Sequence, residues 1–432
     1  MLRDELYDAI LELPVIDVHS HIHRDHMAAQ NLEQVMFYHM LEYCLRSAGL
    51  KEGKLWGKKG AKKRGLPLDE WFVYWPSVKH TGFGWVLRRI LEDLYEVEGP
   101  LTADRLPQLH AAFEEKVSRP DWPREVLDKA GVSRLCSSEL DVKPLEEGQW
   151  DGRIRFTVED SPSCGTREFI PWRERLAWLG RVLGRDVSSA ERLQEAMTKS
   201  YDTYDWSDKC AMVAWVSSDA DFRPVDESVV DTLLTNCLAG REPDTIGRRV
   251  LEASLIRAMC RAVQGRVGTI QFCYGIQYLA ADFSVAHPVL RAAPQFASSA
   301  GYLLGEFPDI HFNVMNGFEP DEPIWAGMCQ AYGNVSLGCF WWNMYFPSVM
   351  HNALHRRLDM VPLSRLAGFL SDGWCVDYVY GRVSVARRVL ANVLTEKIER
   401  GFWTRDEALK AARAILFDTP RRLFLPNEKL DT

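Results

Sequence analysis

The sequence predicts an α/β fold, a closed (β/α)8 barrel of the TIM type with a helical insertion after its first strand. Short apolar segments of β type alternate along the chain with segments of helical periodicity, which implies a parallel sheet. Eight such β segments can be counted, the number that closes a barrel of this type. An open, doubly wound sheet is the alternative, but no G-x-G-x-x-G motif follows the first strand, so a dinucleotide-binding fold is poorly supported.

The predicted strands are short runs rich in apolar and β-branched residues. In chain order they cover residues 15–18, 132–137, 154–158, 210–216, 267–273, 310–315, 335–340 and 366–370. Helical periodicity over 246–263 and 295–304 precedes the fifth and sixth of them, as a repeated β/α unit requires.

Residues 40–130 lack this alternation and carry helical periodicity instead, interrupted by Pro120 and Pro123. We therefore expect residues 1–39 and 131–432 to form the barrel and residues 40–130 to form a helical insertion. Length alone suggests two or three domains, but a barrel with insertions can exceed roughly 400 residues as one unit.

The composition excludes several classes of protein. The formal net charge of −8 argues against a surface that binds nucleic acid or an acidic membrane. The ten cysteines are dispersed without a C-x-x-C motif, which is typical of reduced, buried thiols and not of a disulfide framework. The acidic N-terminal segment is unlike a secretory signal, and no apolar run approaches the ~20 residues of a membrane span. We expect a cytoplasmic enzyme with a small-molecule substrate, without nucleic-acid or membrane contacts, that assembles as a homo-oligomer.

Two histidines end the first predicted strand. Val15, Ile16 and Val18 follow Pro14, and His19 and His21 come at the end of this β-branched run. Alternate residues of a strand point to the same face, so the two imidazoles lie on one side. Nitrogen ligands in this arrangement suit a divalent metal such as zinc, and we favour metal binding over a solvated loop.

Asp372 is the strongest candidate partner for the two histidines. It follows the last predicted strand, 366–370, and the reactive groups of such barrels collect where strands end. From there it can complete a metal site, or act as a general base on a metal-bound water or a substrate carbon. Standing before Gly373, it could otherwise be a turn residue.

Other strand ends supply weaker candidates. Glu159 ends the third strand, Cys273 the fifth, and Trp341 and Trp342 the seventh. The two tryptophans could wall a substrate pocket or pack beneath the rim, and the sequence does not separate these alternatives. Cys273 is a possible soft ligand, but packing is the more common role of a cysteine in an apolar strand.

Several of these motifs occur in the same order in the uronate isomerase family of the amidohydrolase superfamily. They are the His-x-His strand end, the pair Trp341-Trp342, and Ser371-Asp372. Two further similar segments are Asn31-Leu32-Glu33-Gln34 with His39 and Arg46-Ser47-Ala48-Gly49, and the helical stretch after Asp372 with Tyr380, Arg382 and Arg387-Arg388. The resemblance is diffuse but covers nearly the whole chain, including the insertion.

The resemblance implies a barrel of the metal-dependent hydrolase kind that binds one divalent metal ion, usually zinc, and interconverts an aldehyde-form uronate with its keto form. His19, His21 and Asp372 would be the metal ligands. Asp372 would also move the proton between the two carbons through a cis-enediol. His39 would contact the substrate and assist catalysis, and Trp341 or Trp342 would form a pocket wall.

The chain also departs from the family's pattern. Cys273 stands where the family has a histidine, Gly373-Trp374 stands where Asp372 would be followed by Ser-Arg, and Glu159 replaces a second arginine. A substrate carboxylate would lose charge-assisted, bidentate hydrogen bonds without those guanidinium groups. We therefore expect a substrate other than a simple hexuronate, with a neutral or cationic group facing Glu159.

Two other functions remain open from the sequence. The first is a hydrolase or lyase of the amidohydrolase type, in which a metal-activated water attacks an amide, ester or related bond. The second is a remodelled, non-catalytic member, against which the presence of both histidines and Asp372 argues.

Overall fold

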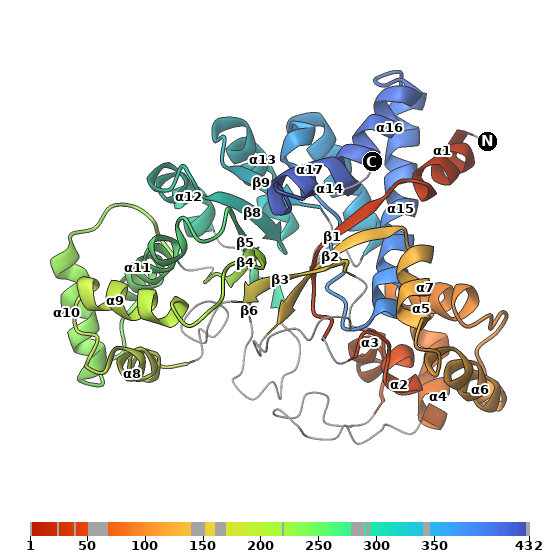
Figure 1. Cartoon of the computed structure of the whole chain (residues 1–432), viewed down its shortest axis with the longest axis horizontal. Helices are drawn as coiled ribbons and strands as arrows, with labels where there is room; N and C mark the ends of the chain where they lie inside the picture. The colour runs from red at the N-terminus through yellow and green to blue at the C-terminus, as the bar shows by residue number, and fades with distance from the viewer. Residues whose placement is uncertain are drawn as a thin grey trace.

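In the computed structural model, eight parallel strands form a curled sheet at the centre of the molecule, and helices surround it (Figure 1). The structure describes residues 2–23, 26–38, 40–50, 68–139, 152–159, 170–217, 220–277, 289–290, 294–339 and 346–428. Neighbouring strands follow the order β1-β2-β3-β4-β5-β8-β9-β10. This arrangement confirms the predicted barrel fold.

The eight strands lie within one to three residues of the predicted segments at most of their ends. They are β1 (Val15–Ser20), β2 (Val132–Glu139), β3 (Ile154–Glu159), β4 (Lys209–Trp215), β5 (Thr269–Tyr274), β8 (His311–Asn316), β9 (Val335–Gly338) and β10 (Leu366–Ala367). A two-stranded antiparallel pair, β6 (Ile276–Gln277) with β7 (Val289–Leu290), was not predicted.

The last strand returns to the first and closes the barrel. Asp17 pairs with Phe369 in a parallel bridge, and the backbone N–H of Val18 donates to the Phe369 carbonyl at 2.9 Å. The strand is shorter than the predicted 366–370, because Gly368 adopts a φ of 85° that a regular strand does not allow. A Cβ atom at Gly368 would also meet Val18 Cγ1 at 2.8 Å, so only glycine permits this close approach.

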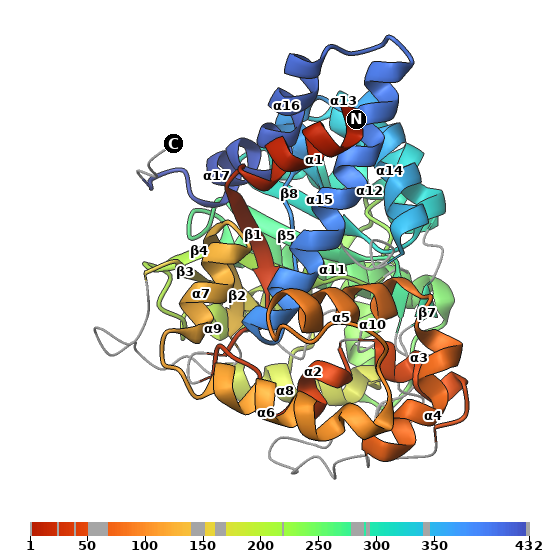
Figure 2. The same cartoon turned by 90° about the vertical axis from the view of Figure 1, so that its right-hand side faces the viewer.

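Between β1 and β2 the described residues form six α-helices, and the division of the chain into a barrel and an insertion of residues 40–130 stays a prediction. The six helices are α2 (Leu32–Met36), α3 (Leu41–Ser47), α4 (Leu68–Val78), α5 (Gly82–Asp93), α6 (Leu106–Val117) and α7 (Trp122–Lys129). The break between α6 and α7 lies at the predicted prolines, and Pro123 stands in the first turn of α7, where a missing N–H costs nothing. Of these helices, α5 and α7 pack against the long helix α15 (Val376–Glu399), and α2, α3, α4 and α6 lie toward the bottom of Figure 2.

Close packing joins the insertion to the barrel. Gly381 of α15 faces α5, and a Cβ atom there would meet Val86 Cγ1 at 2.5 Å and Ile90 Cδ1 at 2.8 Å. The two helices therefore approach each other at a distance that only glycine allows. Because α15 begins just after Asp372, the insertion packs against the helix that follows the candidate site.

The remaining helices cover the outside of the sheet. They are α1 (Leu2–Leu11), α8 (Trp172–Leu183), α9 (Ala190–Tyr201), α10 (Glu227–Leu238), α11 (Thr245–Val263), α12 (Pro294–Glu306), α13 (Glu322–Ala331), α14 (Pro347–Met360), α16 (Arg405–Arg413) and α17 (Thr419–Phe424). Helices α8 to α11 form a lobe at the left of Figure 1, away from the insertion at the right.

A buried ion pair fixes the ends of two strands. Arg357 Nε donates to Glu322 Oε2 at 2.7 Å and its Nη2 donates to Oε1 at 2.5 Å, with both side chains at most 2% exposed. Arg357 Nη1 also donates to the Gly338 carbonyl at the end of β9. Asn316, at the end of β8, donates to Glu322 Oε1 at 2.7 Å. This network holds α13 and α14 against the edge of the sheet at which the candidate site lies.

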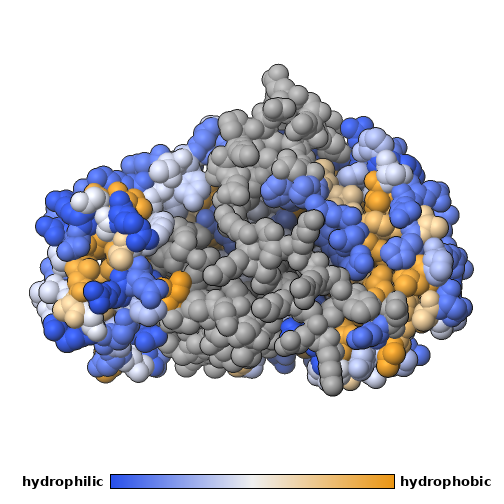
Figure 3. Space-filling model, turned by 90° about the horizontal axis from the view of Figure 1, so that it is seen from below, coloured by the Kyte–Doolittle hydropathy of each residue, from blue (hydrophilic) through white to orange (hydrophobic). Residues whose placement is uncertain are grey.

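On the face drawn in Figure 3, hydrophilic side chains form much of the surface that the described residues provide, with apolar residues between them on both sides of the molecule. None of the helices in the described part of the chain combines the length and apolar character that a membrane crossing requires.

Candidate active site

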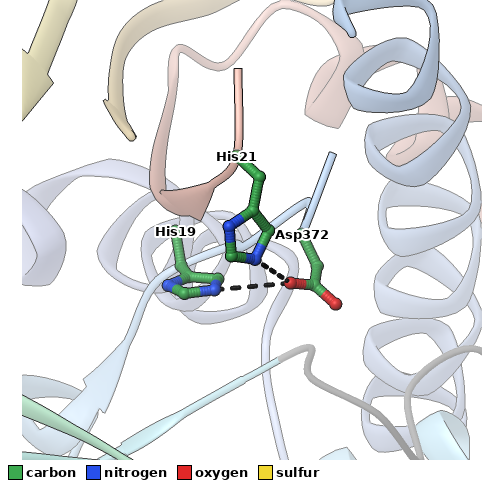
Figure 4. A group of neighbouring side chains, drawn as sticks. All are labelled: His19, His21 and Asp372. Atoms are coloured by element: carbon green, nitrogen blue, oxygen red, sulfur yellow. Dashed lines mark hydrogen bonds and ion pairs between the residues drawn. The ribbon is translucent and has the colours of Figure 1, made fainter. Parts of the chain in front are cut away.

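Three of the predicted site residues meet at one point. His19 lies in β1, and His21 comes directly after this strand. Their Nε2 atoms lie 3.3 Å and 3.0 Å from the same oxygen, Oδ1 of Asp372 (Figure 4). The two imidazole rings are nearly perpendicular, with an interplanar angle of 88°. The side-chain alternation of the strand and the closure of the barrel thus place two nitrogens and one carboxylate together.

Backbone hydrogen bonds hold this geometry. The N–H of Asp372 donates to the His19 carbonyl at 3.0 Å, and the N–H of His21 donates to the Gly373 carbonyl at 2.8 Å. Asp372 has a φ of 53°, in the left-handed region that aspartate tolerates better than most residues. The turn after β10 is therefore attached to β1 in a conformation that directs the carboxylate toward the histidines.

The donor atoms fit a divalent metal ion. His19 is fully buried, and neither of its ring nitrogens has a hydrogen-bond partner among the described residues; the 3.3 Å approach of Nε2 to Asp372 lacks hydrogen-bond geometry. A buried imidazole without partners is costly, and a metal ion satisfies such a nitrogen. Two imidazoles and a carboxylate form a ligand set that zinc accepts.

Asp17 is hydrogen-bonded to the backbone of residues that carry or adjoin the three candidate ligands. Its Oδ1 accepts hydrogen bonds from the backbone N–H of Ser371 at 2.9 Å and of His19 at 3.3 Å. Burial raises the pKa of Asp17 to about 7. In the sequence, Asp17 is only the residue two positions before His19. Its long-range contact to Ser371 depends on barrel closure, and no local pattern predicts it.

The charges around His21 favour its protonated form in the metal-free protein. Burial opposes the charge, but the hydrogen bond to Asp372 and the charges of Asp372, Glu159 and Asp17 outweigh it and raise the pKa of His21. The same negative charges would attract a cation to this point.

Glu159 lies near the site at the end of β3. Its Oε1 accepts a hydrogen bond of 2.9 Å from Nε1 of Trp215, at the end of β4. The indole fixes the orientation of the carboxylate, which is half-buried and acts electrostatically on His21. Sequence reasoning selected Glu159 but not Trp215, although both residues end neighbouring strands.

Trp374 was not selected as a site residue, yet it stacks on a candidate metal ligand. Its ring lies 4.8 Å from the His21 ring with an interplanar angle of 19°, and the residue is 41% exposed. An exposed indole in this position offers an apolar face to a bound molecule. Its position two residues after Asp372 was the signal available in the sequence.

The other predicted site residues do not join this group in the described structure. Cys273 is buried on β5 and is absent from the cluster of ligand atoms that His19, His21 and Asp372 form. His39, Trp341 and Trp342 lie outside the described residues, so their predicted substrate contacts remain predictions.

Comparison with curated proteins supports the resemblance seen in the sequence. The chain is 22% identical to uronate isomerase from Thermotoga petrophila over 444 residues, which cover 97% of this chain and 96% of that protein. No family model matches the chain. The chain is thus a divergent relative of the uronate isomerases, and the predicted resemblance is confirmed over nearly its whole length.

Solved structures confirm the fold. Uronate isomerase from Thermotoga maritima superposes with a TM-score of 0.79 at 18% identity and covers 98% of this chain and 97% of its own. Glucuronate isomerase from Caulobacter crescentus gives the same TM-score at 16% identity, with 100% and 95% covered. A protein of Lactobacillus casei described as a metal-dependent hydrolase is more distant, with a TM-score of 0.56 at 13% identity and 97% of each chain covered.

Proposed function

We propose that this divergent relative of the uronate isomerases is a metal-dependent enzyme that isomerises a hydroxy-carbonyl compound of sugar type between its aldose and ketose forms. The observation that carries this proposal is the convergence of His19, His21 and Asp372 on one point at the mouth of a closed barrel. His19, His21 and Asp372 would hold one divalent ion, of which zinc fits the donor set best.

When bound, such an ion supplies a Lewis acid that stabilises the negative charge developing on the substrate oxygens. The chain's own residues supply the proton transfer. Oδ1 of Asp372 faces the imidazoles, and its second oxygen points away from them (Figure 4). We assign to this carboxylate the removal of a proton from the carbon beside the carbonyl and its return to the neighbouring carbon, through an enediol.

The surroundings of the site favour a substrate without a carboxylate at the position near Trp374 and Glu159. The exposed Trp374 ring can pack against the C–H face of a sugar but provides no positive charge. Glu159 adds a negative charge that would repel a substrate carboxylate. A neutral or cationic sugar derivative therefore fits these residues better than a simple hexuronate.

The test is incubation of the metal-loaded protein with paired substrates in deuterated water. Glucuronate and glucuronamide differ only at one carbon, where a neutral amide of similar size replaces the charged carboxylate. NMR of the products reports both conversion and deuterium at carbon. We expect carbon-bound deuterium in a ketose product, with faster turnover of the amide. Cleavage of an amide or ester in a panel of such compounds, without carbon-bound deuterium, would replace the proposal with the hydrolase or lyase alternative.

A further inference from the structure

A second group of metal-ligating side chains lies between two outer helices. His351 and His355 are four residues apart on α14, and Glu396 lies on α15. The Nε2 atom of His351 is 2.7 Å from Glu396 Oε1, and that of His355 is 2.9 Å from Oε2. Each imidazole thus forms a hydrogen bond with a different oxygen of the same carboxylate.

This group is separate from the candidate active site. Helix α15 begins at Val376, close to Asp372, whereas Glu396 lies near its far end, about 30 Å away at 1.5 Å per residue. Helices α14 and α15 pack against each other on the outside of the barrel (Figure 2). The cluster therefore plays no part in the chemistry at the barrel mouth.

The donor set matches what a transition-metal ion requires. Two histidines at i and i+4 project from the same face of a helix, a spacing that binds zinc in other contexts. A carboxylate from a second helix supplies the third ligand atom, and one ligand atom from each residue lies within 4.8 Å of the others. The side chains are 28%, 16% and 34% exposed for His351, His355 and Glu396, so an ion and a fourth ligand from solvent can reach them.

The neighbouring cations do not block the site. Lys397 is buried, and its Nζ donates hydrogen bonds to Asp359 Oδ1 at 2.5 Å and to the His355 carbonyl at 3.3 Å. Its ammonium group is therefore directed to these two acceptors. Arg400 Nη2 lies 3.5 Å from Glu396 Oε2, but its side chain is 62% exposed and can turn to solvent. Replacing this weak ion pair by a metal bond costs little.

The alternative is a cluster in which both histidines are simply hydrogen-bonded to Glu396. The separations between the ligand atoms in such a cluster differ little from those in a zinc site. Ligand atoms of a tetrahedral zinc ion lie roughly 3.3 Å from one another, so the present N–O separations need to open by about half an ångström. Rotation of the partly exposed Glu396 side chain suffices for this. The cluster also repeats the composition of the first centre, two Nε2 atoms and a carboxylate.

We propose that His351, His355 and Glu396 form a second divalent-metal site, selective for zinc or a similar transition ion, which cross-links α14 to α15. The three ligands come from two helices, so a bound ion stabilises their packing by preferring the folded chain. Loss of the ion would loosen these helices without removing a group from the active site.

The test uses the full-length protein and zinc itself. The wild type, His351→Gln, Glu396→Gln and the control His110→Gln are equilibrated with zinc chloride and passed through a desalting column, and zinc is counted by mass spectrometry. His110 is a partly buried histidine on α6, outside both groups. We expect two equivalents of zinc in the wild type and in His110→Gln, and one equivalent in the two site variants.

Three further measurements make the result unambiguous. Circular dichroism establishes that the variants are folded, and the midpoint of thermal unfolding is compared in zinc and in chelator. We expect the site variants to lose part of the zinc-dependent rise in the midpoint and to resemble the wild type in chelator. Anomalous diffraction at the zinc edge should show a peak among the three side chains. Wild-type zinc content and midpoint shift in folded His351→Gln and Glu396→Gln, or a peak at the first centre alone, would overturn the proposal.

Discussion

Nε2 of His21 lies 3.0 Å from Oδ1 of Asp372, although 351 positions separate the two residues in the sequence. Barrel closure produces this contact, and it is reinforced by the main chain: the N–H of His21 donates to the Gly373 carbonyl, and the N–H of Asp372 donates to the His19 carbonyl. Because backbone bonds hold the two segments together, side-chain substitutions here can change the chemistry without opening the barrel.

Replacing Asp372 by asparagine should abolish most of the activity. Asparagine keeps the size of the side chain, but under the proposed function it removes both the negative charge that would bind the metal and the base that would move the proton. We expect kcat/KM to fall at least about a hundredfold, with less metal retained after desalting. The control is Asp406→Asn on the exposed surface of α16, which should keep wild-type values. Activity of Asp372→Asn within tenfold of the wild type would remove the carboxylate from the mechanism.

Asp17 should affect metal affinity by positioning the backbone of Ser371 and His19. Its Oδ1 accepts the N–H groups of Ser371 and His19, and asparagine can still accept both, whereas alanine cannot. We expect Asp17→Ala to lower metal affinity roughly 10–100-fold, as losses around a metal ligand commonly do, and Asp17→Asn to lower it much less. Metal affinity is measured by competition with a chromophoric chelator. Equal losses in the two variants would mean that the charge of Asp17, and not its acceptor geometry, is what matters.

Trp374 should determine which substrates are accepted. A guanidinium group in place of the indole could form charge-assisted hydrogen bonds with a carboxylate. We expect Trp374→Arg to shift the ratio of kcat/KM for glucuronate over glucuronamide upward by about tenfold, while Trp374→Phe keeps the wild-type ratio. Steady-state kinetics on the two compounds measures the ratio. No change in Trp374→Arg would show that other residues face that end of the substrate.

Much of this arrangement could be predicted because the signals are local. Val15, Ile16 and Val18 identify the first strand, and the two histidines at its end share a face in any β conformation. Asp372 was found by combining its strand end with the general rule that barrel strands present reactive groups at one edge.

The features that the sequence did not predict depend on contacts between distant segments. The last strand is short because Gly368 must approach Val18, a residue 350 positions earlier in the chain. The stacking of Trp374 on His21 likewise requires the closed barrel. Such contacts leave no periodicity or motif, so propensity and spacing cannot reveal them.

Breaking the buried ion pair between Arg357 and Glu322 by removing one partner should strongly lower the free energy of unfolding. Removing one partner leaves the other charge buried without compensation, so we expect Arg357→Met to lower the free energy of unfolding by about 3–5 kcal/mol. Lys410→Met breaks the exposed pair between Lys410 and Asp406, and we expect it to lower the free energy of unfolding far less than Arg357→Met does, because water screens the exposed charges. Urea unfolding of the three proteins makes the comparison. A small effect of Arg357→Met would indicate that water or rearrangement satisfies Glu322.

His311 should make the protein less stable in mild acid. Burial, together with the charges of Arg365 and Arg422, lowers the pKa of His311 to about 3, while its Nε2 shares a hydrogen bond of 2.8 Å with Ser336 Oγ. In the unfolded chain the imidazole has a pKa near 6.5, so between about pH 6.5 and 3 it binds a proton that it does not bind in the folded chain. The free energy of unfolding therefore falls as the pH drops through this range. Between pH 7 and pH 5 this one residue should remove about 2 kcal/mol.

Glutamine in place of His311 tests this directly, because it cannot titrate but can still bond to Ser336. Urea unfolding at pH 7 and pH 5 should show a smaller fall in the free energy of unfolding for His311→Gln than for the wild type. The difference between the two falls should be close to the contribution expected of His311. The other histidines are common to both proteins and cancel in the comparison. The same loss in both proteins would mean that His311 takes up its proton without unfolding, and that the burial of its ring is relieved as the pH falls.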